Sequence, residues 1–225
     1  MHGSKEKGGL RALFFDLDGT IIKSTFKAKE AKMAIIEKIG KLGLDTHGIS
    51  IDDTMANILQ KAEAQAMKDG KLGLESLRKK VSTVLDKFDI EALSQSRLVE
   101  GAGYALRELK KSGFKVGLVS NSGSKGIKLA LKKFDLDGFF DVVITRDDVQ
   151  RIKPSGDCIR KALSILGYGP NESAYIGDSW VDVMAAKDAG VMAIAMVGGM
   201  SPKEKLLQAS PDIIVSSLGE LLKIV

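Results

Sequence analysis

The sequence predicts an α/β protein: a Rossmann-like, mainly parallel sheet core with an inserted all-helical domain. Three observations favour this fold: an early apolar run ends in two aspartates, apolar segments alternate with helical ones from residue 100 onward, and residues 24–98 show helical periodicity alone. Strand–helix alternation requires crossovers that place helices on both faces of a parallel sheet. We therefore expect an α/β core domain from residues 1–22 and 100–225, and a helical domain from residues 23–99.

The first predicted strand covers residues 12–15, and its apolar residues on both faces are typical of a buried parallel strand. Asp16 and Asp18 follow it, and they point to the same side if the chain stays extended. Two carboxylates at the end of a buried strand are costly unless a divalent cation compensates their charge. Gly19 then permits a sharp turn or the close approach of a ligand. An ordinary Asp-Gly turn is the alternative interpretation.

The inserted segment is rich in Ala, Lys, Glu, Gln and Leu, and its apolar residues recur at helical spacing. Glycines separate its segments, and Asp52 or Asp53 is a candidate N-cap for the second of them. The predicted helices cover residues 26–39, 51–67 and 74–88, with a shorter fourth helix over 90–98.

The C-terminal part alternates regularly between strands and helices. The predicted strands cover residues 115–120, 141–145, 173–177, 191–197 and 212–215, and the predicted helices cover 104–111, 125–134, 157–166 and 181–189, with helical turns after Ser201 and Ser217. In such a sheet, ligands bind outside the carboxyl ends of the strands. Acids, hydroxyls and glycines gather at these ends, as expected for a site that holds both a metal ion and a phosphate.

The composition disfavours several classes of protein. The net charge of +5 is spread along the chain without a block of like charge, which argues against a nucleic-acid partner. The single cysteine, Cys158, excludes an internal disulfide and fits a reducing compartment. No stretch approaches the ~20 apolar residues of a membrane-spanning helix. We expect a cytoplasmic monomer or homodimer without a membrane partner, and a frayed start over residues 1–9.

Asp16 is the candidate nucleophile, because a carboxylate can attack phosphorus and form an aspartyl phosphate. Asp18 is the candidate general acid for the leaving oxygen, and then the base for the water that cleaves the intermediate. Lys153, just before a predicted helix, can neutralise charge on the transferring phosphoryl group. Arg151 is the alternative cation in the same loop.

Two further pairs of residues follow predicted strands. Ser120 and Asn121 offer a hydroxyl and backbone N–H groups for phosphoryl oxygens, although an ordinary polar loop is the alternative. Asp178 and Asp182 share a helix face at i and i+4, with a purely capping role as the alternative. With Asp16 they fit an oxygen-ligated Mg²⁺ site.

Four other features carry weaker signals. His47 is expected at the surface, and Cys158 is expected to be a packing thiol. Trp180 shields the site or acts as a hydrophobic plug. The pair Gly198-Gly199 is too short for a phosphate loop.

Four blocks occur in order: Asp-Leu-Asp-Gly-Thr at 16–20, Ser120-Asn121, Lys153-Pro154, and Gly177-Asp178-Ser179 with Asp182. Over residues 11–197 this series resembles the haloacid dehalogenase-like hydrolase superfamily. The insert resembles the helical cap of its phosphoglycolate phosphatase and β-phosphoglucomutase branch, which closes over the site and selects the substrate. Many members of that branch have an acid in place of Lys23 and a proline in place of Gly156.

The resemblance implies a role for each residue of these blocks. Asp16 is the nucleophile and Asp18 the acid/base, and a metal site is formed by Asp16, the Asp18 backbone carbonyl and Asp178, with Asp182 ligating or orienting nearby. The implied phosphate and substrate binders are Thr20, Ser120, Asn121 and Lys153. Dehalogenating members lack an acid at the position of Asp18, so its presence here favours phosphoryl transfer.

We therefore expect a Mg²⁺-dependent phosphatase that hydrolyses a small phosphorylated metabolite, phosphoglycolate-like or a sugar phosphate, through phospho-Asp16. A sugar-phosphate mutase of the same branch is the first alternative. A non-catalytic phosphate-binding or regulatory protein on the same scaffold is the second. No catalytic acid is missing from the blocks, which disfavours the second alternative.

Overall fold

Six strands form the central sheet in the order β5-β4-β1-β6-β7-β8, and every neighbouring pair is parallel. The computed structural model describes residues 9–225, so the expected frayed start falls almost entirely outside the described residues. The strands are β1 (Ala12–Phe15), β4 (Lys115–Val119), β5 (Val142–Ile144), β6 (Ser173–Gly177), β7 (Met192–Met196) and β8 (Ile213–Val215). The predicted α/β fold is confirmed.

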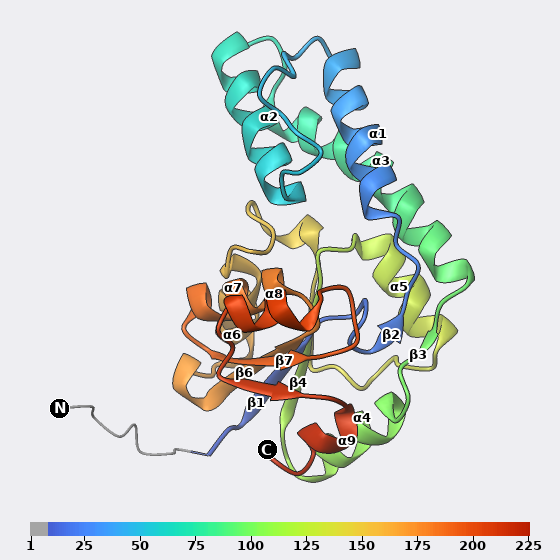
Figure 1. Ribbon diagram of the computed structural model, residues 1–225, viewed down its shortest axis with the longest axis vertical. Coiled ribbons are helices and arrows are strands. Elements are labelled where there is room, and N and C mark those ends of the chain that lie inside the picture. Colours follow the sequence, from blue (N-terminus) through green and yellow to red (C-terminus); the bar gives the residue numbers. More distant parts are fainter. Residues whose placement is uncertain (1–8) are drawn as a thin grey trace, which may run out of the picture.

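Helices cover both faces of this sheet (Figure 1). One face packs against α4 (Ala102–Lys111), α5 (Ser124–Lys133) and α9 (Leu218–Leu221), and the other against α6 (Asp157–Leu166), α7 (Trp180–Ala189) and α8 (Lys203–Gln208). Phe15 packs on the first face and Phe14 on the second, because successive strand side chains point to opposite sides. Two short 3₁₀ segments, η1 (Arg146–Asp148) and η2 (Pro170–Glu172), complete the core.

The inserted residues form a separate helical layer above the carboxyl edge of the sheet (Figure 1). Three helices, α1 (Ala28–Lys41), α2 (Met55–Asp69) and α3 (Leu74–Ser94), bury an apolar cluster of their own, which includes Ile35, Ile58 and Val81. We call this unit the cap domain. A two-stranded antiparallel ribbon, β2 (Ile22–Lys23) and β3 (Arg97–Leu98), joins it to the core. The ribbon lies close to the expected domain boundaries, which stay a prediction.

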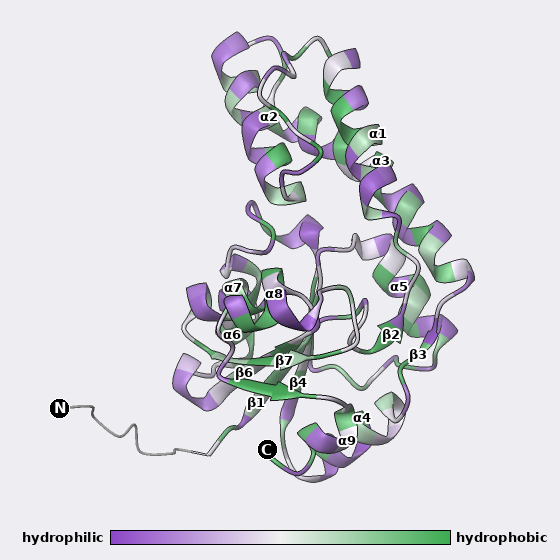
Figure 2. Cartoon of the chain, in the orientation of Figure 1, coloured by the Kyte–Doolittle hydropathy of each residue, from purple (hydrophilic) through white to green (hydrophobic). Residues whose placement is uncertain are grey.

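The hydropathy of the chain follows these layers (Figure 2). The sheet strands are predominantly hydrophobic, whereas the cap helices combine hydrophobic and hydrophilic residues. No helix within residues 9–225 combines the length and apolar character that crossing a membrane requires.

Two expectations for the cap domain are wrong. The predicted fourth helix over 90–98 does not exist, because α3 continues without a break to Ser94 and the chain then enters β3. No glycine or proline interrupts α3, and its Asp89 is buried against the core. The N-cap of α2 is Thr54, whose hydroxyl accepts from Asn57 N at 3.1 Å, rather than Asp52 or Asp53.

Candidate active site

The sheet topology brings the predicted catalytic residues to one edge. β1 lies between β4 and β6, so the segments that follow these three strands meet above their carboxyl ends. Asp16 follows β1, Ser120 follows β4, and Asp178 follows β6. Lys153 reaches the same point from the loop before α6, and Asp182 from the first turn of α7.

Lys153 is the centre of the buried polar cluster. Its side chain is only 3% exposed, and Nζ lies 2.7 Å from Asp16 Oδ1 and 2.6 Å from Asp182 Oδ1. Nζ also donates to the hydroxyl of Tyr175 at 2.8 Å, and that hydroxyl donates to the Val119 carbonyl. Burial lowers the pKa of Lys153, but Asp16 and Asp182 outweigh it and raise that pKa well above its ordinary value. The ammonium is therefore held charged beside Asp16, the candidate nucleophile.

Asn121 holds the backbone of Lys153. Lys153 N donates to Asn121 Oδ1 at 3.0 Å, and Asn121 Nδ2 donates to the Lys153 carbonyl at 3.2 Å. The Asn121 side chain is thus paired with protein, whereas the predicted phosphate contact of this segment is through backbone N–H groups, and Asn121 lines the cavity described below. Ser120 is also buried there, and its hydroxyl accepts from Ser122 N at 3.1 Å.

Asp182 has no free oxygen. Its Oδ1 accepts from Lys153, while Oδ2 accepts from both the backbone N and the hydroxyl of Ser179 in a capping box at the start of α7. The capping role that the sequence offered for Asp182 is therefore present, together with a contact to Lys153 that the sequence did not predict. This geometry favours an orienting role for Asp182 over direct ligation of a metal.

Asp178 is completely buried and has one unpaired oxygen. Its Oδ2 accepts from Met200 N, whereas Oδ1 has no hydrogen-bond partner. A Cβ atom at Gly19 would lie 1.9 Å from Asp178 Oδ2, and one at Gly199 would lie 2.0 Å from it. Both loops therefore require glycine at these positions in order to close around the carboxylate.

The cluster carries more negative charge than its lysine can balance. One oxygen from each of Asp16, Asp178 and Asp182 lies within 4.8 Å of the others. Burial, reinforced by the neighbouring carboxylates, raises the pKa of Asp16 well above its ordinary value despite the opposing effect of Lys153. Burial and the charge of Asp182 raise the pKa of Asp178 to about 7.

These observations test whether a metal ion fits the site. An unpaired buried carboxylate oxygen on Asp178 and an excess of negative charge form an all-oxygen donor set that suits a hard divalent cation. The residues present therefore fit the metal site that the sequence predicts.

Asp18 lies beside this cluster in a distinct environment. Its Oδ2 accepts from the Ser122 hydroxyl at 2.9 Å. Burial raises the pKa of Asp18 above its ordinary value, against the lowering effect of hydrogen bonds from Ser24 and Ser122. A raised pKa favours the protonated form, which a general acid needs.

A cavity of about 530 Å³ separates this polar cluster from the cap domain. Asp16, Asp18 and Ser120 line its core side, and Lys32 and Met55 line its cap side. Trp180 and Lys205, from α7 and α8, also contribute to its wall. The cavity can therefore enclose a small anionic molecule between the two domains.

Several sequence predictions fall outside the cavity. Thr20 is fully buried, its hydroxyl has no partner, and it does not line the cavity. Arg151 was the alternative cation, but its exposed side chain pairs with Asp157 instead. His47 lies in an exposed turn of the cap domain, and Cys158 is a buried packing thiol whose pKa burial raises to about 11.

Sequence reasoning missed two parts of the site. Tyr175 lies within β6, where the sequence pattern indicates only a buried strand residue, although its hydroxyl contacts Lys153. The pair Gly198-Gly199 is too short for a phosphate loop, yet the loop that contains Gly199 and Met200 encloses Asp178. A glycine pair directly after a strand end was the available signal for this loop.

The chain is similar to known proteins over most of its length. A family model described as haloacid dehalogenase-like hydrolase matches residues 13–196. The chain is 36% identical over 119 residues to pyrophosphatase PpaX of Bacillus cereus, which covers 53% of this chain and 55% of that protein. It thus aligns with about half the length of this relative. A Caldanaerobacter subterraneus protein of the same PpaX name is 28% identical over 218 residues, covering 96% of this chain and 94% of that one.

Solved structures show the same fold. A haloacid dehalogenase-like hydrolase structure from Bacteroides fragilis has a TM-score of 0.69 and 28% identity, covering 94% of this chain and 99% of its own. CbbY from Rhodobacter sphaeroides, solved in complex with phosphate, has a TM-score of 0.63 and 22% identity, covering 94% of this chain and 96% of its own.

Proposed function

The chain belongs to the haloacid dehalogenase-like hydrolases, and from that premise we propose that it is a Mg²⁺-dependent phosphatase acting on a small phosphorylated metabolite. One observation carries the proposal: Lys153 Nζ joins Asp16 and Asp182 in a buried cluster, next to the unpaired oxygen of Asp178. This arrangement supplies a nucleophilic carboxylate, a fixed cation and oxygen ligands for a metal at one point.

In the proposed first step, an Asp16 carboxylate oxygen forms a bond to phosphorus while the bond from phosphorus to the leaving oxygen breaks. Asp18 donates its proton to that leaving oxygen. In the second step a water molecule loses its proton to Asp18 and attacks phosphorus, which releases phosphate and restores the Asp16 carboxylate. Lys153 stays charged throughout and stabilises the negative charge on the phosphoryl oxygens.

We propose that Asp16, Asp178 and the backbone carbonyl of Asp18 hold the Mg²⁺ ion. When bound, it supplies positive charge that stabilises the phosphoryl oxygens during transfer. Asp182 acts on Lys153 instead, because both of its oxygens already have protein partners. The sequence predicts that Asp182 either ligates the metal or orients a neighbouring group, and we propose the second of these roles.

The cavity favours a small substrate with anionic character. Its volume of about 530 Å³ and the lysines in its wall, Lys32 and Lys205, are consistent with a leaving group that carries negative charge. The PpaX name of two relatives makes inorganic pyrophosphate the first compound to test. Phosphoglycolate and sugar phosphates are the next. The location of the protein and its oligomeric state stay predictions.

The test is hydrolysis of 4-nitrophenyl phosphate with added Mg²⁺ and with a chelator. We expect Mg²⁺-dependent release of phosphate by the wild type and none by Asp16→Asn. Asp157→Asn is the matched control, because Asp157 pairs with Arg151 and Arg160 away from the cavity. Activity retained in Asp16→Asn contradicts the phospho-aspartyl route. A panel of phosphorylated compounds, ranked by kcat/KM, then identifies the substrate class, and an isomerised sugar phosphate instead of free phosphate identifies a mutase.

A further inference from the structure

A buried arginine outside the catalytic cluster joins the cap domain to the loop that follows β4. Arg146 is the first residue of η1, and its side chain is 5% exposed. Its guanidinium nitrogens contact Ser82, Asp86 and Asp89, which lie on one face of α3 at spacings of four and three residues. Nη1 also donates to the backbone carbonyl of Asn121 at 3.3 Å. Every nitrogen of the guanidinium thus has a protein partner.

Two glycines allow the helix to approach this loop so closely. A Cβ atom at Gly123 would lie 2.4 Å from Arg146 Nη2 and 2.5 Å from Asp86 Oδ1, and one at Gly126 would lie 2.9 Å from Asp89 Cβ. Asp89 Oδ2 also accepts from the backbone N of Gly123 at 3.0 Å. The cap helix α3 is therefore docked directly on the loop and on the first turn of α5.

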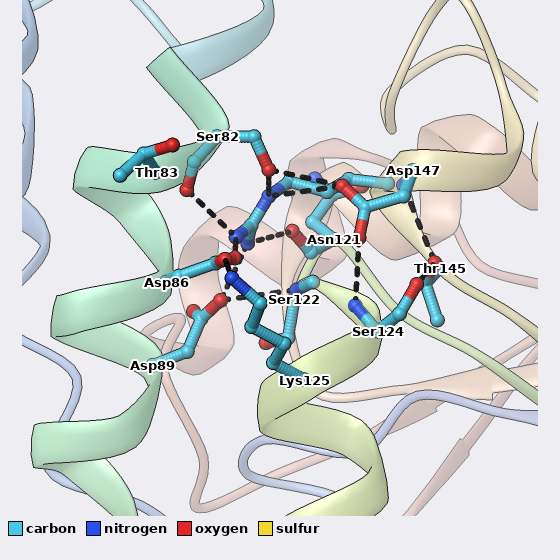
Figure 3. Close-up of polar contacts among 12 residues, drawn as sticks. Ser82, Thr83, Asp86, Asp89, Asn121, Ser122, Ser124, Lys125, Thr145 and Asp147 are labelled. Carbon is cyan, nitrogen blue, oxygen red and sulfur yellow. Dashed lines mark hydrogen bonds and ion pairs between the residues drawn. The ribbon is translucent and has the colours of Figure 1, made fainter. Parts of the chain in front are cut away.

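Further polar contacts surround this junction (Figure 3). Asp147 bridges the two domains, because its Oδ1 accepts from the Ser82 hydroxyl at 3.0 Å and its Oδ2 accepts from Ser124 N at 2.8 Å. Lys125 lies 3.3 Å from Asp86. In Figure 3, Asp86 and Asp89 project from α3 toward the loop that carries Asn121 and Ser122.

The same loop orients the candidate general acid. Ser122 lies between Asn121, whose carbonyl contacts Arg146, and Gly123, whose N–H contacts Asp89. The Ser122 hydroxyl donates to Asp18 Oδ2 at 2.9 Å. Because Oδ2 accepts this bond, we assign the transferable proton of Asp18 to Oδ1. A shift of α3 displaces the backbone on both sides of Ser122 and disturbs this hydrogen bond.

We propose that Arg146 is a positioning residue, which holds Asp18 ready to donate its proton while α3 is docked on the core. The inference rests on the proposed phosphatase function. In the step concerned, Asp16 bonds to phosphorus, the bond to the leaving oxygen breaks, and the proton of Asp18 passes to that oxygen. Arg146 acts on this step through Asn121, Asp89 and Ser122.

Leaving-group dependence provides a readout that a merely structural role does not change. Phenyl phosphate and 4-nitrophenyl phosphate are similar in size, but phenolate is the stronger base and needs a proton from the general acid more. We expect Arg146→Lys to lower kcat/KM for both substrates, and the fold-loss for phenyl phosphate to exceed the fold-loss for 4-nitrophenyl phosphate by at least about tenfold. A lysine keeps the charge but cannot reach α3 and the Asn121 carbonyl together.

A second variant tests the inference if Arg146→Lys does not fold. Arg146→Met combined with Asp89→Asn removes one charge of each sign, and Asp86 keeps Lys125 as a partner. We expect the same selective loss in this variant, with folding verified by thermal unfolding. Arg78→Met is the matched control, because Arg78 is an arginine on α3 itself that pairs with Glu63 inside the cap domain. It should leave the ratio of the two kcat/KM values unchanged.

Two outcomes overturn the inference, and they are distinguishable. Equal factors for both substrates in the folded Arg146 variants, including no loss at all, show that Arg146 does not act on proton donation and leave the proposed function intact. A wild type that hydrolyses neither substrate in the presence of Mg²⁺ overturns the proposed function, and this inference with it.

Discussion

Replacing Asp182 by asparagine separates the two roles that its position permits. Asp182 accepts four hydrogen bonds: from Lys153 Nζ at 2.6 Å and the Tyr175 hydroxyl at 3.3 Å on Oδ1, and from Ser179 N at 3.0 Å and the Ser179 hydroxyl on Oδ2. An asparagine side chain has a single acceptor oxygen, so Asp182→Asn cannot serve Lys153 and the capping box together. The substitution therefore removes either the bonds that the Asp182 carboxylate accepts from Ser179 in the capping box or one of the two carboxylate partners of Lys153.

The magnitude follows from these contacts. Loss of a capping interaction costs about 1 kcal/mol, and loss of a hydrogen bond to a charged group costs about 1.5–3 kcal/mol. Lys153 keeps Asp16 at 2.7 Å, so its charge is not left alone. We expect the free energy of unfolding to fall by roughly 1–3 kcal/mol. Because domains are typically stable by 5–15 kcal/mol, the variant remains folded.

The effect on activity distinguishes orientation from ligation. If Asp182 orients Lys153, kcat falls by about 10²–10³, as for loss of one preorganised electrostatic contact. The Mg²⁺ concentration for half-maximal activity then rises much less in Asp182→Asn than in Asp178→Asn, which removes a proposed ligand. We expect the two rises to differ by at least about tenfold. Titration of activity with Mg²⁺, together with calorimetric binding of the ion, measures both. An equal weakening of Mg²⁺ binding in the two variants refutes the reasoning.

Two further predictions concern stability. Burial raises the pKa of Asp141, but hydrogen bonds from Lys110, Val116 N and Lys115 outweigh it and bring that pKa to about 2. A depressed pKa stabilises the fold above about pH 4 and loses this effect as the pH falls toward 2; after screening by solvent we expect about 1 kcal/mol. The difference in free energy of unfolding between wild type and Asp141→Asn should therefore be present at neutral pH and shrink in acid, and a constant difference contradicts this. In β4, a Cβ at Gly117 would lie 2.5 Å from the ring of Phe14. We expect Gly117→Ala to cost about 1–3 kcal/mol by overpacking, measured by denaturant unfolding, whereas Gly113→Ala is unsuitable as a control because its φ is +87°. Gly103→Ala, inside α4 with no atom nearer than 3.9 Å, is the suitable control and should not destabilise.

The arrangement of the core could be predicted because its signals are local. The strand over residues 12–15 and the helix over 157–166 were predicted with the bounds that the structure shows. Apolar runs, helical periodicity and glycine stops each act within a few residues of the chain. Parallel topology then places the ends of β1, β4 and β6 at one edge, so Asp16, Ser120 and Asp178 could be assigned to a common site.

The cap domain was predicted less well, because its boundaries depend on the core. Asp89 is a charged residue that an isolated helix would expose, but it is buried here against Gly126 and Arg146. This contact belongs to the tertiary structure, which carries α3 past the predicted end at 88. Nothing in the local sequence marks Arg146 as different from any other charged residue after a strand.

By itself, the sequence determined the fold class, the order of the core strands and the identity of the acids and the lysine that gather at one edge of the sheet. Only the tertiary structure decided which hydrogen-bond partners these residues have. Asp182 accepts hydrogen bonds from Lys153 and Ser179, and Asn121 pairs with the backbone of Lys153, whereas one oxygen of Asp178 has no partner. The physical reason is range. Secondary structure follows from neighbours along the chain, whereas hydrogen-bond partners depend on packing between segments far apart in sequence, as with the 137 residues that separate Asp16 from Lys153.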